Sequence, residues 1–179
     1  ILGASGEEAV EDLINFDITP SVFTYEFAKA LSYEAERKEK VTKIHIKIDT
    51  GMSRIGFLAG ENNEEIVDEI IKISKLPYIE IEGIFSHFAT SDEYDKSYTL
   101  LQYGRFMDVC NRLEEKGLNI PIKHICNSAG IMMYPEMHLD MVRPGVILYG
   151  MYPSDEVDKS RLDLIPAMTL KSTITHIKE

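Results

Sequence analysis

The chain has 179 residues, 44% of them apolar, which is enough for an ordinary domain with a hydrophobic core. Its 19 basic and 30 acidic residues give a net charge of −11, which argues against a surface that binds nucleic acid. The two cysteines, Cys110 and Cys126, show no metal-like spacing, so we expect no metal site and a reducing, cytoplasmic setting. No apolar run approaches the ~20 residues that span a bilayer, and no leader precedes the first helix, so we expect neither a membrane segment nor export.

Short apolar strands alternate with helical patterns along the chain, which is typical of βα units and a parallel sheet. Ser5 is the expected N-cap of the first helix, because Glu7 and Glu8 follow in the turn where the helix dipole favours acidic side chains. The predicted strands are residues 18–24, 43–49, 78–85, 122–126 and 142–149. The predicted helices are residues 5–16, 26–38, a segment from the cap candidates Asn62 and Asn63 to just before Pro77, 96–116 and 129–133.

Two of these helices have a predicted buried face. For residues 26–38 that face consists of Phe27, Ala30, Leu31 and Ala35. For residues 96–116, with Gly117 as the stop signal, it consists of Tyr98, Leu101, Phe106, Val109, Cys110 and Leu113.

With residues 1–3, which look like the last residues of another strand, we count about six strands of barrel type, two short of a closed ring. The predicted fold class is therefore α/β, a TIM-type (β/α)8 barrel of which residues 1–150 form a part. Residues 151–166 are predicted to be a surface connection, and the alternation of residues 167–179 predicts the start of a C-terminal β domain. Because both ends interrupt strand-like patterns, we expect a piece of a larger protein; a trimmed small domain is the alternative.

The strand at residues 43–49 carries polar side chains on one face. A period of two places its three isoleucines on one side and His45, Lys47 and Asp49 on the other. If the isoleucines pack under the helices, the polar three point into the barrel. A buried lysine is costly without a partner, so Lys47 should have a specific one. The alternative is that this face is a solvated sheet edge.

Candidate functional residues follow the strands at their carboxyl ends, where barrel enzymes place working groups. Arg54 lies in a turn between Gly51 and Gly56, directly after the strand at residues 43–49. His87 follows the strand at residues 78–85. A single histidine is often only structural, so His87 by itself is an open candidate.

Two later segments together predict a phosphate site. Residues 127–130, Asn-Ser-Ala-Gly, leave a strand and open a short helix, where backbone N–H groups can meet an anion. Arg143 supplies a cation, and Gly145 and Val146 follow it at a point where the backbone can approach closely. Each pattern is weak alone, but their joint placement predicts a phosphate-anchored cofactor or substrate.

Four stretches in order resemble the alanine racemase family, whose members are pyridoxal 5'-phosphate (PLP) enzymes. They are residues 47–56 (KIDTGMSRIG), 86–93 (SHFATSDE), 127–129 (NSA) and 142–150 (VRPGVILYG). Agreement over four long motifs makes a chance match negligible. The resemblance implies a cytoplasmic, homodimeric isomerase that interconverts L- and D-alanine for peptidoglycan synthesis.

The resemblance also implies residue roles. Arg143 would bond the pyridine nitrogen of PLP, a contact that keeps this nitrogen unprotonated and favours racemisation over side reactions. Arg54 would bond the phenolic oxygen, and Lys47 is a candidate for carbamylation, its new negative charge holding Arg54. His87 would lie beside the ring, in the polar network next to Arg143.

The phosphate would be held by Asn127, Ser128 and the backbone of Gly145 and Val146, as the resemblance implies. Two groups of the family's chemistry have no match in these residues: the Schiff-base lysine, and the tyrosine that a partner subunit contributes. We therefore expect the chain alone to be inactive.

Other interpretations stay open. A serine racemase of the same family differs at positions outside these segments. A non-catalytic, PLP-holding barrel protein shares the phosphate site but lacks a β domain. A folding fragment without a function of its own is the third.

Overall fold

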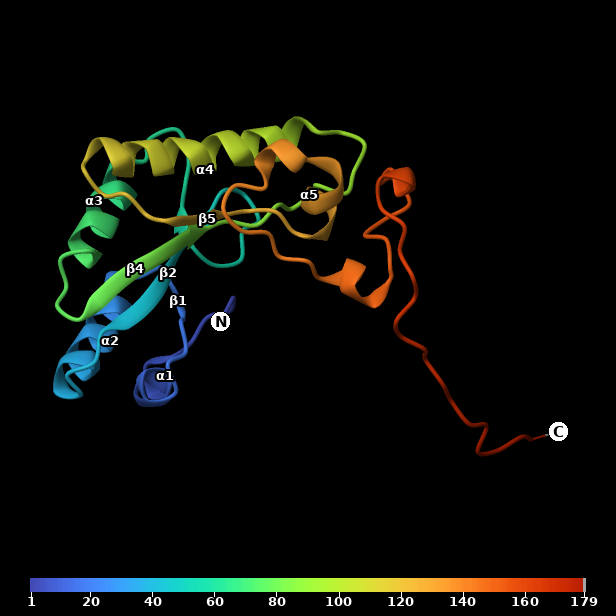
Figure 1. Cartoon of the computed structure of the whole chain (residues 1–179), viewed down its shortest axis with the longest axis horizontal. Helices are drawn as coiled ribbons and strands as arrows, with labels where there is room; N and C mark the ends of the chain where they lie inside the picture. Colours follow the sequence, from blue (N-terminus) through green and yellow to red (C-terminus); the bar gives the residue numbers. More distant parts are fainter. Residues whose placement is uncertain (179) are drawn as a thin grey trace.

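The computed structural model describes residues 1–178, which form a curved sheet of parallel strands in the order β1-β2-β4-β5 (Figure 1). A short additional strand, β3, pairs with the carboxyl end of β2, also in parallel. The prediction of a parallel βα sheet is confirmed. The strands are β1 (Ser21–Val22), β2 (Thr42–Asp49), β3 (Phe57–Leu58), β4 (Ile79–Phe85) and β5 (Ile122–His124).

Helices connect these strands, and α2, α3 and α4 lie around one side of the sheet (Figure 1). Thr24 caps α2 by accepting a hydrogen bond from the N–H of Phe27 at 3.3 Å, and Asn63 stands at the N-cap of α3. The α-helices are α1 (Val10–Asn15), α2 (Tyr25–Arg37), α3 (Glu64–Ile73), α4 (Ser97–Glu115) and α5 (Ser128–Met133). Single 3-10 turns cover Glu7–Ala9, Pro135–Met137, Val146–Tyr149 and Lys159–Arg161.

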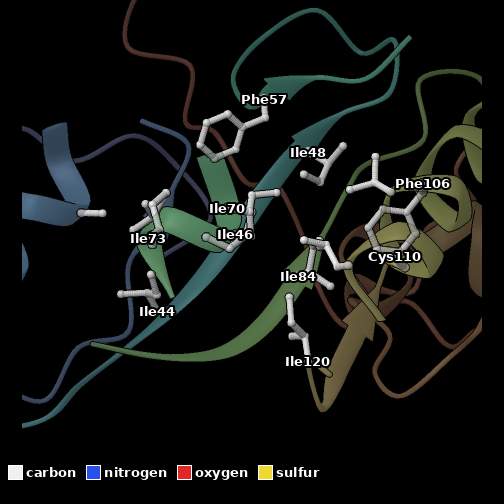
Figure 2. Close-up of a cluster of buried hydrophobic side chains, with 14 of the residues drawn as sticks. Ile44, Ile46, Ile48, Phe57, Ile70, Ile73, Ile84, Phe106, Cys110 and Ile120 are labelled. Atoms are coloured by element: carbon white, nitrogen blue, oxygen red, sulfur yellow. The ribbon is translucent and has the colours of Figure 1, made fainter. Parts of the chain in front are cut away.

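The hydrophobic core lies between the sheet and these helices. Ile44, Ile46 and Ile48 of β2 are fully buried, as the alternation of this strand predicts. Figure 2 shows them in a row with Ile70 and Ile73 of α3 beside them. Burial of each isoleucine side chain contributes about 1.5–3 kcal/mol, so this packing holds β2 in a single register.

The register between the strands decides which side chains share the polar face of the sheet. Lys47 of β2 is paired with Phe85 of β4, and Phe85 is paired with His124 of β5. Residues paired across parallel strands point to the same face of the sheet. Lys47, Phe85 and His124 therefore form a row on the face opposite the isoleucine core.

Several predicted elements are wrong at their ends. Ser5 does not cap the first helix, which begins as a 3-10 turn after Gly6. The first strand is only two residues long, because Ile18 still bonds the end of α1 through Leu13 and Pro20 has no N–H to offer. In α4, Tyr98 and Leu101 are exposed rather than buried, while Thr99 and Gln102 are buried in their place.

The prediction of a strand at residues 142–149 is also wrong. The N–H of Arg143 bonds the carbonyl of Cys126, but Pro144 has no N–H, and the chain then turns into a 3-10 helix at Val146–Tyr149. Fewer strands are therefore present than the six counted. Residues 167–178 contain no strand, because no other strand pairs with them, and their apolar side chains are exposed. Glu179 lies outside the described residues.

Across residues 1–178, every helix is too short or too polar to serve as a membrane span.

Candidate active site

The site is built at the carboxyl ends of β2, β4 and β5, and Lys47 lies at its centre. Lys47 is buried, and its ammonium donates to the carbonyl of Ile48 at 3.0 Å and lies 5.1 Å above the ring of Phe85. Burial, followed by the nearby cation of Arg143, lowers the pKa of Lys47 to about 8. The amine is therefore still mostly charged at neutral pH, but its neutral form is far more populated than that of an exposed lysine.

Arg143 closes the site from the segment that follows α5. Its Nη2 donates to the carbonyls of Ser86 at 2.7 Å and of Ile125 at 3.1 Å, and Nη1 donates to Nδ1 of His124. The guanidinium also lies 5.4 Å from the ring centre of Phe85. Burial lowers the pKa of Arg143 to about 10, so the side chain is still a cation at neutral pH.

A chain of hydrogen bonds runs from Arg143 along the polar face of the sheet to Glu82. Because Arg143 can only donate, His124 accepts at Nδ1 and must carry its proton on Nε2. Nε2 then donates to Nδ1 of His45 at 2.9 Å, and Nε2 of His45 donates to Glu82 at 3.4 Å. Glu82 is in turn paired with Lys43 at 2.6 Å. All the protons of this chain point from Arg143 toward Glu82, so both imidazoles are neutral.

The electrostatics agree with neutral histidines. Burial, then the charge of Arg143, lowers the pKa of His124 to about 2 and that of His87 to about 4. Burial likewise lowers the pKa of His45. Arg143 is therefore surrounded by neutral acceptors and keeps its full positive charge directed into the site.

Arg54 reaches the site from the turn after β2. Asp49 accepts the N–H groups of Gly51 at 2.9 Å and Ser53 at 3.0 Å, which folds the turn back on the strand end. Gly51 and Gly56 have φ of 135° and 128°, a region that favours glycine. The side chain of Arg54 is exposed and lines the cavity above Lys47.

The two segments of the predicted phosphate site, residues 127–130 and the segment from Arg143 to Val146, meet at Ser128. The hydroxyl of Ser128 accepts the N–H of Gly145 at 2.8 Å. The amide oxygen of Asn127 accepts the N–H of Gly130 at 2.9 Å and caps α5. The prediction that these segments converge is confirmed, but the N–H of Gly145 is bonded to Ser128 rather than free for an anion.

Two adjoining cavities hold all the predicted site residues. One, of about 470 Å³, is lined by Lys47, Arg54, His87 and Arg143. The other, of about 390 Å³, is lined by Asn127, Ser128, Gly145 and Val146, and it shares His87 and Arg143 with the first. Nδ1 of His87 lies 3.4 Å from Arg143, which makes it part of the same polar network.

Sequence reasoning missed Phe85, His124, Glu82 and Gln102. His124 could have been found from the alternation of residues 122–126, which places it on the opposite side from Ile125. The ring of His124 is stacked on that of Phe85, with centroids 4.8 Å apart. Gln102 gives no such signal, because a single polar residue in a helix looks like part of its solvent-facing side.

Comparisons with known proteins identify the family of the chain. Residues 1–153 match the family model described as alanine racemase, N-terminal domain. An alanine racemase of Clostridium tetani is 54% identical over 99% of the chain, and one of Methanococcus maripaludis is 49% identical over all of it. The chain covers 45% and 47% of these two proteins, and so spans about half the length of the curated relatives it matches.

Solved structures give the same result. An alanine racemase of Clostridium difficile 630, in complex with cycloserine, has a TM-score of 0.92 and 49% identity, covering 99% of this chain and 48% of that one. A histidine racemase of Leuconostoc mesenteroides has a TM-score of 0.82 and 27% identity, covering 93% and 44%. The parallel sheet is thus part of an α/β TIM-type barrel, and the chain belongs to the alanine racemase N-terminal domain family.

Proposed function

We propose that these residues belong to a PLP-dependent alanine racemase that interconverts L- and D-alanine for peptidoglycan synthesis. The observation that carries the proposal is the cavity in which Lys47, Arg54, His87 and Arg143 converge at the carboxyl ends of the strands. Relatives named alanine racemase, at 46–54% identity, support the substrate. The enzyme is expected to work in the cytoplasm as a homodimer, with a Schiff-base lysine and a catalytic tyrosine supplied from outside these residues.

The cavity has the chemistry that PLP requires. PLP carries a phosphate and a phenolic oxygen, both of which are negatively charged, and a flat pyridine ring. Arg54 and Arg143 present cations to the cavity of about 470 Å³, while the cavity beside it is lined by the small residues Ser128 and Gly145. We assign the ring to the first cavity and the phosphate to Asn127, Ser128 and the backbone of Gly145 and Val146, where the N–H of Gly145 would exchange its bond to Ser128 for one to the phosphate. When bound, PLP supplies an electron sink for loss of the α-proton of an amino acid.

The chain's own residues orient this group. Arg143 would donate to the pyridine nitrogen of a bound PLP, and because its guanidinium keeps its proton, that nitrogen would stay unprotonated. The bonds from Arg143 to Ser86 and Ile125 fix the direction of its guanidinium. His87, held neutral by its low pKa, lines this cavity and would lie beside the ring without adding charge.

Lys47 is proposed to be carbamylated. A neutral lysine amine can attack carbon dioxide, forming an N–C bond and releasing one proton, and the lowered pKa of Lys47 supplies the neutral amine. The resulting carbamate would turn a buried cation into an anion between Arg54 and Arg143. Mass spectrometry and ¹³C NMR of protein exchanged with labelled bicarbonate test this; a free Lys47 amine at about pH 8 would refute it.

For domain organisation, we propose that residues 1–150 are barrel, residues 151–166 a connection, and residues 167–179 the entry to a second domain. The exposed apolar side chains of residues 167–178, among them Leu170 and Ile174, support this, because a second domain would bury them. Limited proteolysis of a full-length enzyme checks it: cleavage should concentrate in residues 151–166.

The test of function is an assay of full-length enzyme with L-alanine, L-serine and L-histidine as substrates. D-alanine should form fastest. A preference for serine would favour a serine racemase, and PLP binding without turnover would favour a non-catalytic barrel. The isolated chain should form no D-alanine above the rate of free PLP, because it supplies neither base. Saturable D-alanine formation by residues 1–179 would overturn this.

A further inference from the structure

Helix α4 carries a polar stripe that faces the site loops. Tyr98, Gln102 and Arg105 are spaced by four and three residues, so they lie on one side of the helix. Each of them bonds the backbone or a side chain of the turn after β2, the turn that carries Arg54. None of the three belongs to the cavity lining described above.

Gln102 joins two separate loops. It is fully buried, and its Nε2 donates to the hydroxyl of Thr50 at 3.2 Å and to the carbonyl of His87 at 3.1 Å. Its Oε1 accepts the N–H of Ala89 at 2.8 Å. Both amide protons and the oxygen are thus used, which links the turn after β2 to the loop after β4.

Tyr98 and Arg105 hold the same turn on either side of Gln102. The hydroxyl of Tyr98 donates to the carbonyl of Gly51 at 3.0 Å, and Nη1 of Arg105 donates to the carbonyl of Thr50 at 3.1 Å. A side chain at Gly51 would collide with the Tyr98 hydroxyl, so the two surfaces fit closely. The turn is therefore fastened through its backbone, which leaves the side chain of Arg54 free to point into the cavity.

We infer that Tyr98, Gln102 and Arg105 form a positioning clamp that fixes Arg54 and His87 relative to each other for cofactor binding. The role in cofactor binding rests on the proposed function. The clamp itself rests only on the hydrogen bonds of these three side chains. A buried glutamine is costly unless fully bonded, and an apolar residue would fill the same space in α4 more cheaply. The bonds of Gln102 to both loops explain its presence in the core.

The test uses full-length enzyme, first without cofactor, and measures amide hydrogen exchange. Gln102→Met keeps the volume but removes three bonds, so exchange in residues 50–56 and 86–90 should become about tenfold faster. Tyr98→Phe should speed exchange in residues 50–56 only, because the hydroxyl that it removes donates to the carbonyl of Gly51 in that turn. Val109→Ala, a buried change on α4 away from both loops, and Arg112→Met, which breaks surface ion pairs of the same helix, are the controls.

A second measurement is the dissociation constant of PLP, followed by its absorbance. The constant should rise about tenfold in Gln102→Met and stay within about twofold in Arg112→Met. Exchange that changes equally in Gln102→Met and Val109→Ala would show a merely structural glutamine and overturn the clamp. If Gln102→Met does not fold, Tyr98→Phe and Arg105→Met decide the question. Wild-type protein that binds no PLP would refute the proposed function, while the exchange data would still decide the clamp.

Discussion

Arg143 and Arg54 line the same cavity but are held in opposite ways. Arg143 is held by hydrogen bonds of its guanidinium, which donates to two carbonyl oxygens and to His124. Arg54 is exposed, and its turn is gripped through the backbone; among the bonds described for residues 1–178, none involves the Arg54 guanidinium. One cation is pre-assembled by neutral protein groups, and the other is left with donors for a ligand or a carbamate. Replacement of Arg143 should therefore lower both the stability and the activity of the protein. Replacement of Arg54 should lower the activity alone.

The largest effect is expected for Arg143→Glu. The carbonyls of Ser86 and Ile125 lose their donors and face a carboxylate, so the free energy of unfolding should fall by about 3 kcal/mol. In full-length enzyme the carboxylate should allow the pyridine nitrogen to be protonated, lowering the racemase rate about 10³-fold and admitting transamination. Pyruvate and D-alanine are measured together, with Arg143→Lys as the charge-preserving control. An unchanged rate and product spectrum would refute the role of Arg143.

Arg54→Met should separate function from stability. We expect the racemase rate to fall about 100-fold, because the proposed contacts of Arg54 with the phenolic oxygen and with a Lys47 carbamate would both be lost. The free energy of unfolding should change by less than about 0.5 kcal/mol, since the turn keeps its backbone bonds. Arg37→Met, at an exposed ion pair on α2, is the matched control and should leave both quantities unchanged. A stability loss as large as that of the Arg143 variant would contradict the comparison.

The smallest effect concerns pH and the neutral groups around Arg143. The folded pKa of His124 is about 2, whereas an unfolded histidine titrates near ~6.5, so below ~6.5 the unfolded state binds the extra proton. Stability is therefore greatest above ~6.5 and is lost as the pH falls toward 2, by up to about 1.4 kcal/mol per pH unit.

Urea unfolding at about pH 7 and about pH 5 measures this loss. His124→Gln keeps an acceptor for Arg143 and a donor for His45, so it should make the dependence shallower, while His87 and His45, whose pKa values are also lowered, keep part of it. His176→Gln, in the exposed final segment, should leave the dependence as in wild type. An equal slope in wild type and His124→Gln would show that His124 is not the neutral acceptor we describe.

Local patterns predicted the secondary structure well where burial and hydrogen bonding agreed. Residues 43–49 alternate strictly, and β2 covers them with Ile44, Ile46 and Ile48 buried. The same reasoning failed at residues 142–149. Their apolar residues predict a strand, but Pro144 has no backbone N–H to donate to a neighbouring strand. The backbone of that segment bonds Cys126 and Ser128 instead of extending a ladder. A strand needs a neighbouring strand, and sequence periodicity does not report one.

The prediction for α4 failed for a related reason. Its apolar residues include Tyr98 and Leu101, which the 3.6-residue period places near the buried face. The structure turns that part of the helix toward the site loops, so Gln102 is buried there while Leu101 is exposed. The loops carry unpaired backbone groups that a polar side chain can satisfy, and burial follows that demand rather than hydrophobicity.

What the sequence determined by itself is the parallel βα order and the set of polar residues that stand at strand ends. Lys47, Arg54 and His87 could be placed without coordinates, because strand period and turn glycines put them at the carboxyl edge of the sheet. Arg143 could be named as the cation of the phosphate segment, but on a strand that the structure does not contain. The tertiary structure decided their partners. The row of Lys47, Phe85 and His124, and the bond that Arg143 donates to His124, join residues far apart in the chain through strand register. Register is set by the packing of the isoleucine core against the helices, and no local pattern contains it.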